Sequence, residues 1–525
     1  MRDSDADLAG TPRSGAPTVR PGPATDQLDP RRWRALFVML MGQFCALLDV
    51  SVTNVALPSI GRSTGAGPTE LQWVVSGYIL AFGLMPVIGG RLGDATGRRR
   101  MFVIGVTGFV VASAAAGLAP SPGTLIAVRV VQGLFGGVIG PQVSGFIQNT
   151  FPRTERGRAF GRLGLTVGVG TALGPVVGGL LIAAGGPEYG WRLVFFINVP
   201  IGLVAVLLAR AWVPVVRPRA ASSNRLDLLG AALLGTGLLC VLFPVVEINQ
   251  GHDARLFLLL VPAAGLLLLF VRREARLTRA DAGPLLDLRL FRVPTFVTGV
   301  VFAVVFFCSN TGIPLVLSLY YQDGLGFTAL HSGLGVTTLA LGSVLGAPLA
   351  GRLVQRVGRP LVVGAVLVFF LATTVIGLVL LLDPVTSPLQ VGLRLALPLF
   401  VLGIAGGSIV TPNQTLTLAE VDPARGGAAG GVLQTAQRVG SATGQTVLGT
   451  VFVAALGAGV AAGGAGRPGP YTGAVSSALA VSLLFSGSAL VLSVVELRRA
   501  RRARTAAGSG PGSEDGTDAQ DPSAA

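Results

Sequence analysis

The 525-residue sequence is too apolar for a soluble protein: 51% of its residues are hydrophobic, 12% are charged and the mean hydropathy is +0.69. Soluble domains carry roughly 25% charged residues, so about half of the usual surface charge is missing. The net charge of +15 comes from 40 basic residues that are all arginine, and the absence of lysine excludes a P-loop nucleotide site and a lysine Schiff base. The two histidines and three cysteines lie far apart, which predicts no metal site, no cofactor and free buried thiols.

Apolar runs of about 20 residues, long enough to cross a bilayer as a helix, dominate the chain. Residues 1–30 are polar and Pro-rich, which predicts a disordered tail, and residues 498–525 predict a second one. Between them, fourteen spans are expected at 35–60, 71–92, 101–119, 123–147, 159–184, 191–213, 226–248, 255–271, 294–320, 330–351, 360–382, 390–416, 428–456 and 473–497. The predicted fold is an all-α membrane protein with 14 transmembrane helices.

The arginines are distributed unevenly between the two sides of the predicted membrane. With a cytoplasmic N-terminus, 33 of the 40 lie inside, five lie outside, and Arg129 and Arg438 fall within spans. This asymmetry follows the positive-inside rule and explains the basic charge without a nucleic acid partner. Arginine without lysine, alongside many Ala, Gly and Val residues, indicates a GC-rich bacterial source. We therefore expect a multi-pass protein of the bacterial plasma membrane with both termini in the cytoplasm.

Three short motifs recur in the same order in the two halves of the chain. GRLGDATGR at 90–98 matches GRLVQRVGR at 351–359, LIAVR at 125–129 matches QVGLR at 390–394, and GVGTALGPVVGG at 168–179 matches RVGSATGQTVLG at 438–449. Ordered repeats of this kind predict two homologous six-helix bundles. These bundles are expected at 31–213 and 294–497, with an inserted two-helix hairpin and its basic connectors at 214–293.

The repeat and its motifs resemble the major facilitator superfamily. The central helix pair and LLDVSVTNVALPSI at 47–60 resemble its fourteen-helix drug:proton antiporters, as do LIAVRVVQGLFGG at 125–137 and WRLVFFINVPIG at 191–202. The resemblance implies a monomeric secondary transporter, not an enzyme, that exports small amphipathic drugs or antibiotics in exchange for protons by alternating access. The permease subunit of an ATP-driven pump and a membrane-embedded sensor are the alternatives. The two-lobe motifs and the lack of a nucleotide site favour the antiporter over the pump.

Asp49 is the clear carboxylate deep within a predicted span, and such groups are functional candidates. At 1.5 Å per residue, Asp49 in the first span and Arg129 in the fourth both lie ~9 Å below the outer side. The superfamily fold places these two spans side by side, so we expect an Asp49–Arg129 contact that switches with proton binding. Loss of the contact in an apolar cavity would favour the neutral acid. A static pair that fixes helix packing is the alternative.

Other polar residues within the spans are candidates for a substrate cavity. Gln132 lies one turn beyond Arg129 on nearly the same face, and Gln43 and Asn54 belong to the first span. Ordinary hydrogen bonds between helices would explain them equally well. Arg438 could contact either substrate or the loop at Asp94, and the sequence leaves both possibilities open.

The loop after the second span is a candidate cytoplasmic gate, formed by Gly90, Gly93, Asp94, Gly97 and Arg98. Family resemblance implies that Asp94 faces the N-terminus of the span that begins near Gly427, where the helix dipole favours an anion. Gln355 replaces this aspartate in the second copy, which predicts a latch on one side only. The alternative is a cluster of arginines that only sets the topology.

Glycines at every fourth position mark the fifth span. Gly170, Gly174 and Gly178 form one smooth stripe that lets a neighbouring helix approach closely, and Pro175 and Gly179 complete the motif. Pro175 is expected to bend the helix because it removes a backbone donor. Family resemblance makes the motif a mark of exporters, and generic close packing is the alternative. A cavity with few acids predicts neutral or singly charged hydrophobic substrates rather than multivalent cations.

Overall fold

The computed structural model describes residues 30–215, 227–248, 254–280, 282–327, 329–382, 387–461 and 468–508. All regular elements within these ranges are helices, and 13 helical segments are long and apolar enough to cross a membrane. The apolar helix Leu228–Pro244 is shorter, and it brings the total to the fourteen that the sequence predicts. The all-α membrane fold is therefore confirmed.

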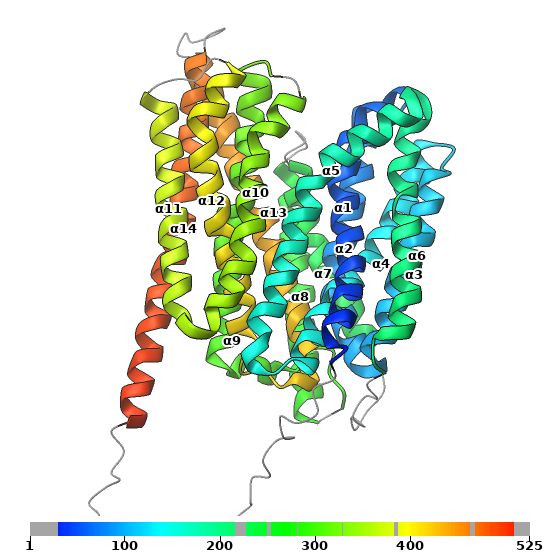
Figure 1. The fold of residues 1–525 in the computed structure, drawn as a ribbon, viewed down its shortest axis with the longest axis vertical. Helices are drawn as coiled ribbons and strands as arrows, with labels where there is room; N and C mark the ends of the chain where they lie inside the picture. The colour runs from blue at the N-terminus through cyan, green and yellow to red at the C-terminus, as the bar shows by residue number, and fades with distance from the viewer. Residues whose placement is uncertain are drawn as a thin grey trace, which may run out of the picture.

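The helices form two lobes that stand side by side (Figure 1). The first lobe contains α1 (Arg32–Thr64), α2 (Pro68–Thr96), α3 (Arg98–Gly117), α4 (Pro122–Thr150), α5 (Arg153–Phe196) and α6 (Asn198–Trp212). The second contains α9 (Pro294–Leu319), η4 (Tyr320–Gly324), α10 (Ala329–Val357), α11 (Arg359–Leu382), α12 (Pro388–Thr417), η5 (Pro423–Arg425), α13 (Gly426–Gly459) and α14 (Pro468–Gly508).

The helix ends show why equivalent positions of the two repeats fold alike. Ser121 and Ser387 cap α4 and α12, each with proline next in the chain and each accepting a hydrogen bond from the backbone three residues on. Gly97 and Gly358 stand at the ends of α2 and α10 with φ angles of 103° and 69°, a conformation that glycine adopts without strain. Both GRLGDATGR and GRLVQRVGR end in Gly-Arg. In each, the glycine forms the turn and the arginine is the first residue of the next helix.

Most helix boundaries lie a few residues from those predicted, and the ends of α5 and α14 differ most. Helix α5 runs on past the expected end at residue 184, and its backbone leaves the helical conformation at Gly186 (φ 74°, ψ 177°), where the fifth span gives way to the sixth. Helix α14 continues to Gly508, so part of the predicted C-terminal tail is helical. The alanines and arginines of this extension are good helix formers, which explains why the helix outlasts the apolar segment.

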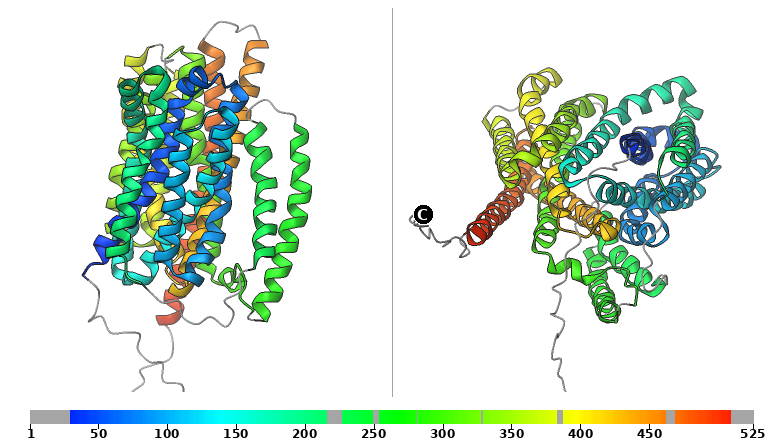
Figure 2. Two further views of the ribbon diagram at one scale, coloured as in Figure 1. Left: turned by 90° about the vertical axis from the view of Figure 1, so that its right-hand side faces the viewer. Right: turned by 60° about the horizontal axis from the view of Figure 1, so that its bottom comes forward.

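The segment between the lobes forms the expected pair of helices on the outside of the bundle (Figure 2). It contains α7 (Leu228–Ile248), η2 (Ala254–Leu259), α8 (Leu260–Arg279) and η3 (Leu288–Arg292). Helix α7 packs against α2 and α13, where the rings of Trp73 and Phe243 lie 5.8 Å apart. Asp227 at the start of α7 forms an ion pair with Arg273 of α8 at 2.8 Å, which ties the two helices together.

The contacts between the lobes follow the same two-fold pattern as the repeat. Helix α2 packs against α13, and its counterpart α10 packs against α5. Glycines allow the close approach: a methyl group on Gly90 would lie 2.3 Å from the carbonyl oxygen of Gly427, and one on Gly351 would lie 2.4 Å from that of Gly157. Any larger residue at these four positions would push the lobes apart.

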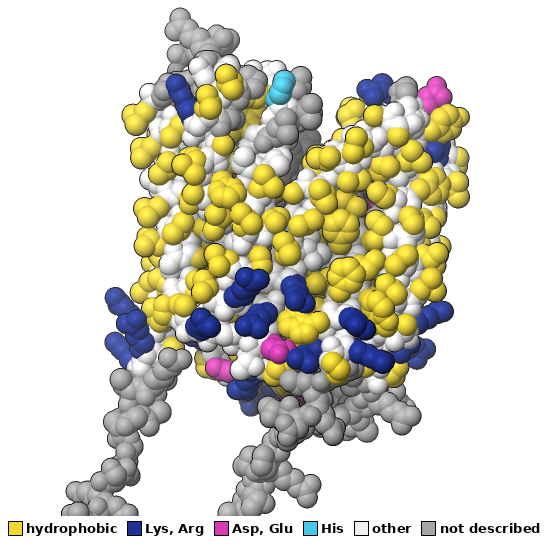
Figure 3. All heavy atoms as spheres, in the orientation of Figure 1, with side chains coloured by type: hydrophobic (Ala, Val, Ile, Leu, Met, Phe, Trp, Pro, Cys, Tyr) yellow, Lys and Arg dark blue, Asp and Glu magenta, His cyan; other side chains and the backbone are white. Residues whose placement is uncertain are grey.

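The surface of the described residues matches a membrane environment. Large apolar side chains cover the sides of both lobes, and arginines gather at one end of the face shown in Figure 3. Helix α1 begins and α14 ends at this arginine-rich end (Figure 1). At the opposite end the molecule is hollowed between the lobes (Figure 3). The lobes are therefore in contact at the arginine-rich end and separated at the other.

Candidate functional site

Asp49 lies in the middle of the first lobe and is 1% exposed. Its carboxylate accepts hydrogen bonds from three side chains on two other helices. Arg129 Nη1 of α4 donates to Oδ2, while Gln132 Nε2 of α4 and Asn198 Nδ2 of α6 donate to Oδ1 at 2.9 Å each. Side chains of α4 and α6 thus fix both oxygens of this carboxylate within the first lobe.

Arg129 is fully buried and is positioned by more than its ion pair with Asp49. Its Nε donates to the carbonyl oxygen of Val74 at 3.1 Å, and its Nη1 also donates to Gln132 Oε1 at 2.7 Å. The guanidinium carbon lies 4.2 Å from the centroid of the Tyr78 ring, a cation–π contact. The sequence prediction of an Asp49–Arg129 contact at one depth thus corresponds to a real contact in the structure.

Two members of this site were not singled out in the sequence. Asn198 donates from one Nδ2 to both Asp49 and Ser113, at 2.9 and 3.0 Å, and Tyr78 donates its hydroxyl to the carbonyl oxygen of Ala46 at 3.1 Å. Asn198 lies in the predicted sixth span, and an isolated amide in an apolar run was the signal that could have found it.

The remaining cavity candidates lie in different surroundings. Gln132 belongs to the Asp49 site, as described above. Gln43 is 7% exposed and its Oε1 has no hydrogen-bond partner among the described residues. A methyl group on Gly140 would lie 3.2 Å from this oxygen and 2.4 Å from Gln434 Oε1, so amides of α1 and α13 meet at α4. Asn54 is exposed and does not reach the ion pair.

The predicted gate segment contacts the second lobe at the arginine-rich end, but most of it is helical and not a loop. Gly90, Gly93 and Asp94 lie in the last turns of α2, which continues to Thr96. The side chain of Asp94 accepts hydrogen bonds from the backbone N–H groups of Gly427 and Ala428 at 3.2 and 2.9 Å, at the start of α13. It also forms an ion pair with Arg98 at 2.6 Å, and Arg98 Nη2 donates to the carbonyl oxygen of Pro423 at 3.2 Å. Asp94 therefore holds a helix N-terminus of the opposite lobe, where a negative charge is favoured.

The glycines of this segment have separate roles. Gly90 allows α13 to approach, and a methyl group on Gly93 would overlap the side chain of Gln142, which donates to the carbonyl oxygen of Gly89 at 2.8 Å. Gly97 provides the turn with its positive φ. Gly90 thus meets a steric requirement of the contact between the lobes, whereas Gly93 and Gly97 meet requirements within the first lobe.

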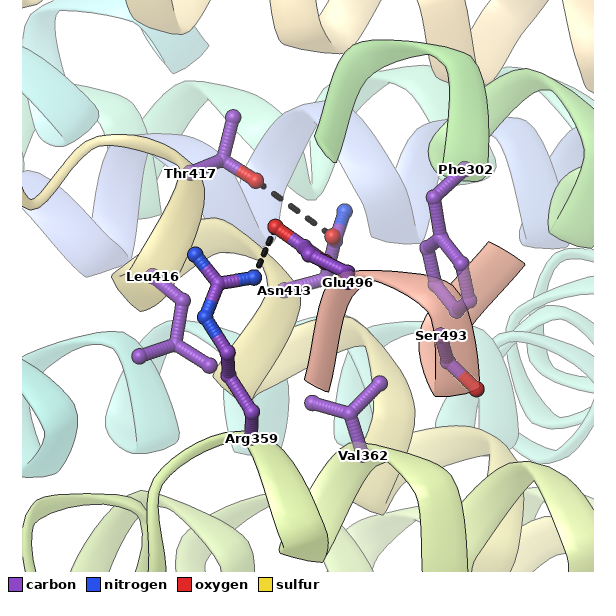
Figure 4. Close-up of a pocket in the computed structure, with 8 residues that line it drawn as sticks. All are labelled: Phe302, Arg359, Val362, Asn413, Leu416, Thr417, Ser493 and Glu496. Carbon is purple, nitrogen blue, oxygen red and sulfur yellow. Dashed lines mark hydrogen bonds and ion pairs between the residues drawn. The ribbon is translucent and has the colours of Figure 1, made fainter. Parts of the chain in front are cut away.

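The second copy of the loop makes a different contact. Arg359, the counterpart of Arg98, forms an ion pair with Glu496 of α14 in its own lobe (Figure 4). Glu496 also accepts a hydrogen bond from Thr298 of α9 at 2.8 Å. The pocket beside this pair, drawn in Figure 4, has a volume of ≈ 10 Å³. That is about the space of one water molecule, so the pocket is too small for a drug-sized compound.

The glycine stripe of α5 packs against α1. A methyl group on Gly170, Gly174 or Gly178 would lie 3.2, 2.2 or 3.2 Å from a side-chain atom of α1, and Ser51 Oγ donates to the carbonyl oxygen of Thr171 at 2.9 Å. Gly179 faces open space, so it takes no part in this contact. The helix stays helical through Pro175, and Gly186 is the residue in α5 with non-helical angles.

Comparison with known proteins identifies the fold family. The sequence model of the major facilitator superfamily matches residues 39–445. The chain belongs to the major facilitator superfamily. It is 36% identical to the probable actinorhodin transporter of Streptomyces coelicolor over 86% of this chain and 79% of that one. It is also 36% identical to the puromycin resistance protein pur8 of Streptomyces alboniger, over 88% and 92% of the two chains.

Further relatives and solved structures agree with this membership. The tetracenomycin C resistance and export protein of Streptomyces glaucescens is 32% identical over 87% of this chain and 80% of its own. Among solved structures, the human organic anion transporter MFSD10 superposes with a TM-score of 0.64 at 16% identity, covering 89% of this chain and 100% of that one. The structural match shows that the two folds agree over most of this chain.

Proposed function

We propose that this major facilitator protein exports small amphipathic compounds in exchange for protons by alternating access. The chemistry of Asp49 carries the proposal. A titratable carboxylate buried inside the first lobe, with donors from α4 and α6, can take up one proton and release it only if its hydrogen bonds rearrange. Relatives of about one-third identity are named for the export of, or resistance to, antibiotics, which supports a cargo of this size and polarity.

The proton cycle follows from the partners of Asp49. The ionised carboxylate accepts from Arg129, Gln132 and Asn198, so it binds α1 to α4 and α6. Protonation removes the charge and weakens these contacts, because a neutral acid is a poorer acceptor for a guanidinium. The helices that line the first lobe are then free to shift relative to one another. In this cycle Arg129 is the positive group whose contact with Asp49 depends on the charge of the carboxylate.

The loop at Asp94 acts as the cytoplasmic latch of the same cycle. We assign the arginine-rich end to the cytoplasm because of the positive-inside rule, which also places both ends of the helical bundle there. Asp94 closes that end by binding the start of α13, while the lobes separate at the outer end (Figure 3). The conformation is therefore outward-facing. Gln355 has no charge with which to form an equivalent contact between α10 and α5, so the latch acts on one side.

The cargo of this transporter is proposed to be neutral or singly charged. Asp49 is the one carboxylate of the described residues at mid-depth in a span, and Arg129 balances its charge. A multivalent cation would need further negative charge to replace its lost hydration. The protein is proposed to work as a monomer in the bacterial plasma membrane, since one chain contains both lobes.

Transport in liposomes without ATP tests the proposed function. Purified protein is reconstituted with puromycin or tetracenomycin C on one side, and a pH gradient is imposed. Accumulation against the concentration gradient that collapses with an uncoupler is the expected result. Accumulation that needs ATP would instead favour the permease of a pump, and no gradient-driven movement of any amphipathic compound would overturn the proposal.

A further inference from the structure

Arg438 is a positive charge at mid-depth for which the described residues provide no carboxylate. It lies about three turns into α13, roughly 18 Å from the start of that helix. No hydrogen bond or ion pair reaches its guanidinium within the described part of the chain. Its recorded contact is with the ring of Phe82 on α2, whose centroid lies 4.7 Å from the guanidinium carbon. A cation in this position is a candidate for binding, and its partner remains to be found.

The side of α13 that carries Arg438 faces the opposite lobe and not the lipid. Two turns earlier a methyl group on Gly431 would lie 2.2 Å from the carbonyl oxygen of Pro86 on α2. One turn earlier Gln434 Nε2 donates to Ser144 Oγ of α4 at 3.2 Å. Positions three and four residues apart share a helix face, so Arg438 continues this interface toward the outer end. It is partly exposed.

The balance of charge in this region is positive. Arg129 is neutralised by Asp49, and no other described acid lies at this depth. The contact of Arg438 with Phe82 offsets only part of the loss of its hydration, because a ring face is a weaker partner than an anion. A planar guanidinium presents parallel N–H groups that match the two oxygens of a carboxylate. The missing partner is therefore an anionic group.

The rings beneath the two arginines form a continuous, largely buried apolar layer. Arg129 lies 4.2 Å from the Tyr78 ring, Tyr78 and Phe82 stack at 5.7 Å, and Arg438 lies over Phe82. The second face of the guanidinium plane can stack with another flat ring. Gln43 adds an unpartnered amide oxygen on α1, which can accept from a hydroxyl group. This combination suits a flat, ring-containing compound with one acidic group.

We infer that Arg438 binds the negative charge of the cargo, so that the transporter prefers ring-containing compounds with one ionised carboxylate or phenolate. The inference rests on the proposed function, which allows a neutral or singly charged cargo. It specifies that the cargo carries one charge and that this charge is negative. Export of such an anion against a proton moves negative charge outward and positive charge inward. The membrane potential of a bacterium, negative inside, drives both movements.

Binding of a matched pair of probes tests the inference. Anthraquinone-2-carboxylate and anthraquinone-2-carboxamide share shape and differ in charge, and their dissociation constants are measured by equilibrium dialysis on purified protein. The wild type is expected to bind the carboxylate about tenfold more tightly or better, as for a charge-assisted hydrogen bond. Arg438→Gln should abolish the preference, and because the stacking plane of the guanidinium is lost as well, binding of the carboxamide should weaken, but less than binding of the carboxylate. Arg438→Lys should keep part of it, because the charge remains and the planar fork is lost.

Arg356→Gln is the control, since it removes one exposed arginine at the cytoplasmic end and should keep the full preference. Equal binding of the two probes by the wild type, no binding of the carboxylate, or a preference that survives Arg438→Gln would overturn the inference. If Arg438→Gln does not fold, the reduced preference of Arg438→Lys decides instead. Proton-driven transport of the carboxamide without any preference for the carboxylate would leave the proposed function standing and remove this inference. A preference that depends on Arg438, without gradient-driven transport, would support the anion site at Arg438 and overturn the proposed function.

Discussion

Asp49 and Arg129 are 80 residues apart in the chain and form a buried ion pair between α1 and α4. Two amides, Gln132 and Asn198, complete the hydrogen bonding of the carboxylate, and Tyr78 lies against the guanidinium. A static pair would need no titration, whereas a proton carrier must lose these contacts once in each cycle. The two interpretations predict different behaviour of the same substitutions.

Asp49→Asn is expected to give a folded, inserted protein that no longer couples export to protons. The amide keeps the size of the side chain and cannot carry the charge that protonation removes. Efflux in an efflux-deficient host and pH-driven transport in liposomes should both fall to background. Asp323→Asn, at an exposed acid, is the matched control and should transport like the wild type. Wild-type efflux by Asp49→Asn would show that Asp49 is not the carrier.

Arg129→Gln is expected to destabilise the protein more than the double substitution Asp49→Asn with Arg129→Gln does. Removing one partner of a buried ion pair leaves an uncompensated charge and costs about 3–5 kcal/mol. Removing both leaves two amides that can bond to each other and to Asn198. Thermal unfolding of the four proteins in detergent gives the coupling between the residues. Additive losses would mean that the pair contributes no coupling to stability.

Asp94→Asn is expected to open the cytoplasmic end. Loss of the charge weakens two backbone hydrogen bonds and the ion pair with Arg98, a change of about 1–3 kcal/mol or roughly a 5- to 150-fold shift of population. Spin labels at Arg100→Cys and Arg356→Cys, one on each lobe, report the separation as a distance distribution. The long-distance fraction should increase.

Gln355→Ala is the matched control for the latch, because it changes the equivalent position of the other repeat. Gln355 is exposed, so its loss should leave the distance distribution of the same label pair unchanged. An equal opening by both variants would contradict a one-sided latch. No opening by Asp94→Asn would leave the loop as a determinant of topology alone.

Gly174→Ala is expected to impair both stability and export, whereas Gly179→Ala should be tolerated. A methyl group at Gly174 would lie 2.2 Å from the Cβ and Oγ atoms of Ser51, while one at Gly179 meets nothing within 4 Å. Forcing α1 and α5 apart costs about 1–3 kcal/mol, the usual range for overpacking. Melting temperature and efflux of the two variants test this pair. Similar losses in both would show that glycine is needed for a reason other than the contact with α1.

Much of the architecture followed from local sequence properties. A span needs a run of apolar residues because its backbone bonds are satisfied within the helix, so hydropathy locates each span without knowledge of its neighbours. Equivalent motifs in the two halves then predicted the two lobes and the hairpin between them. The depth of Asp49 and Arg129 followed from counting residues along their helices, since the helical rise is constant.

The tertiary structure alone decided how these helices are rotated and which polar groups meet. Asn198 reaches Asp49 from α6, Gly179 turns away from α1 although Gly178 faces it, and Arg438 lies over Phe82 of the other lobe. None of these follows from hydropathy, because rotation about a helix axis changes the neighbours of a side chain and leaves its depth unaltered. The sequence by itself determined what crosses the membrane and how deep each charge lies; side-chain packing between helices decided which partner each charge has.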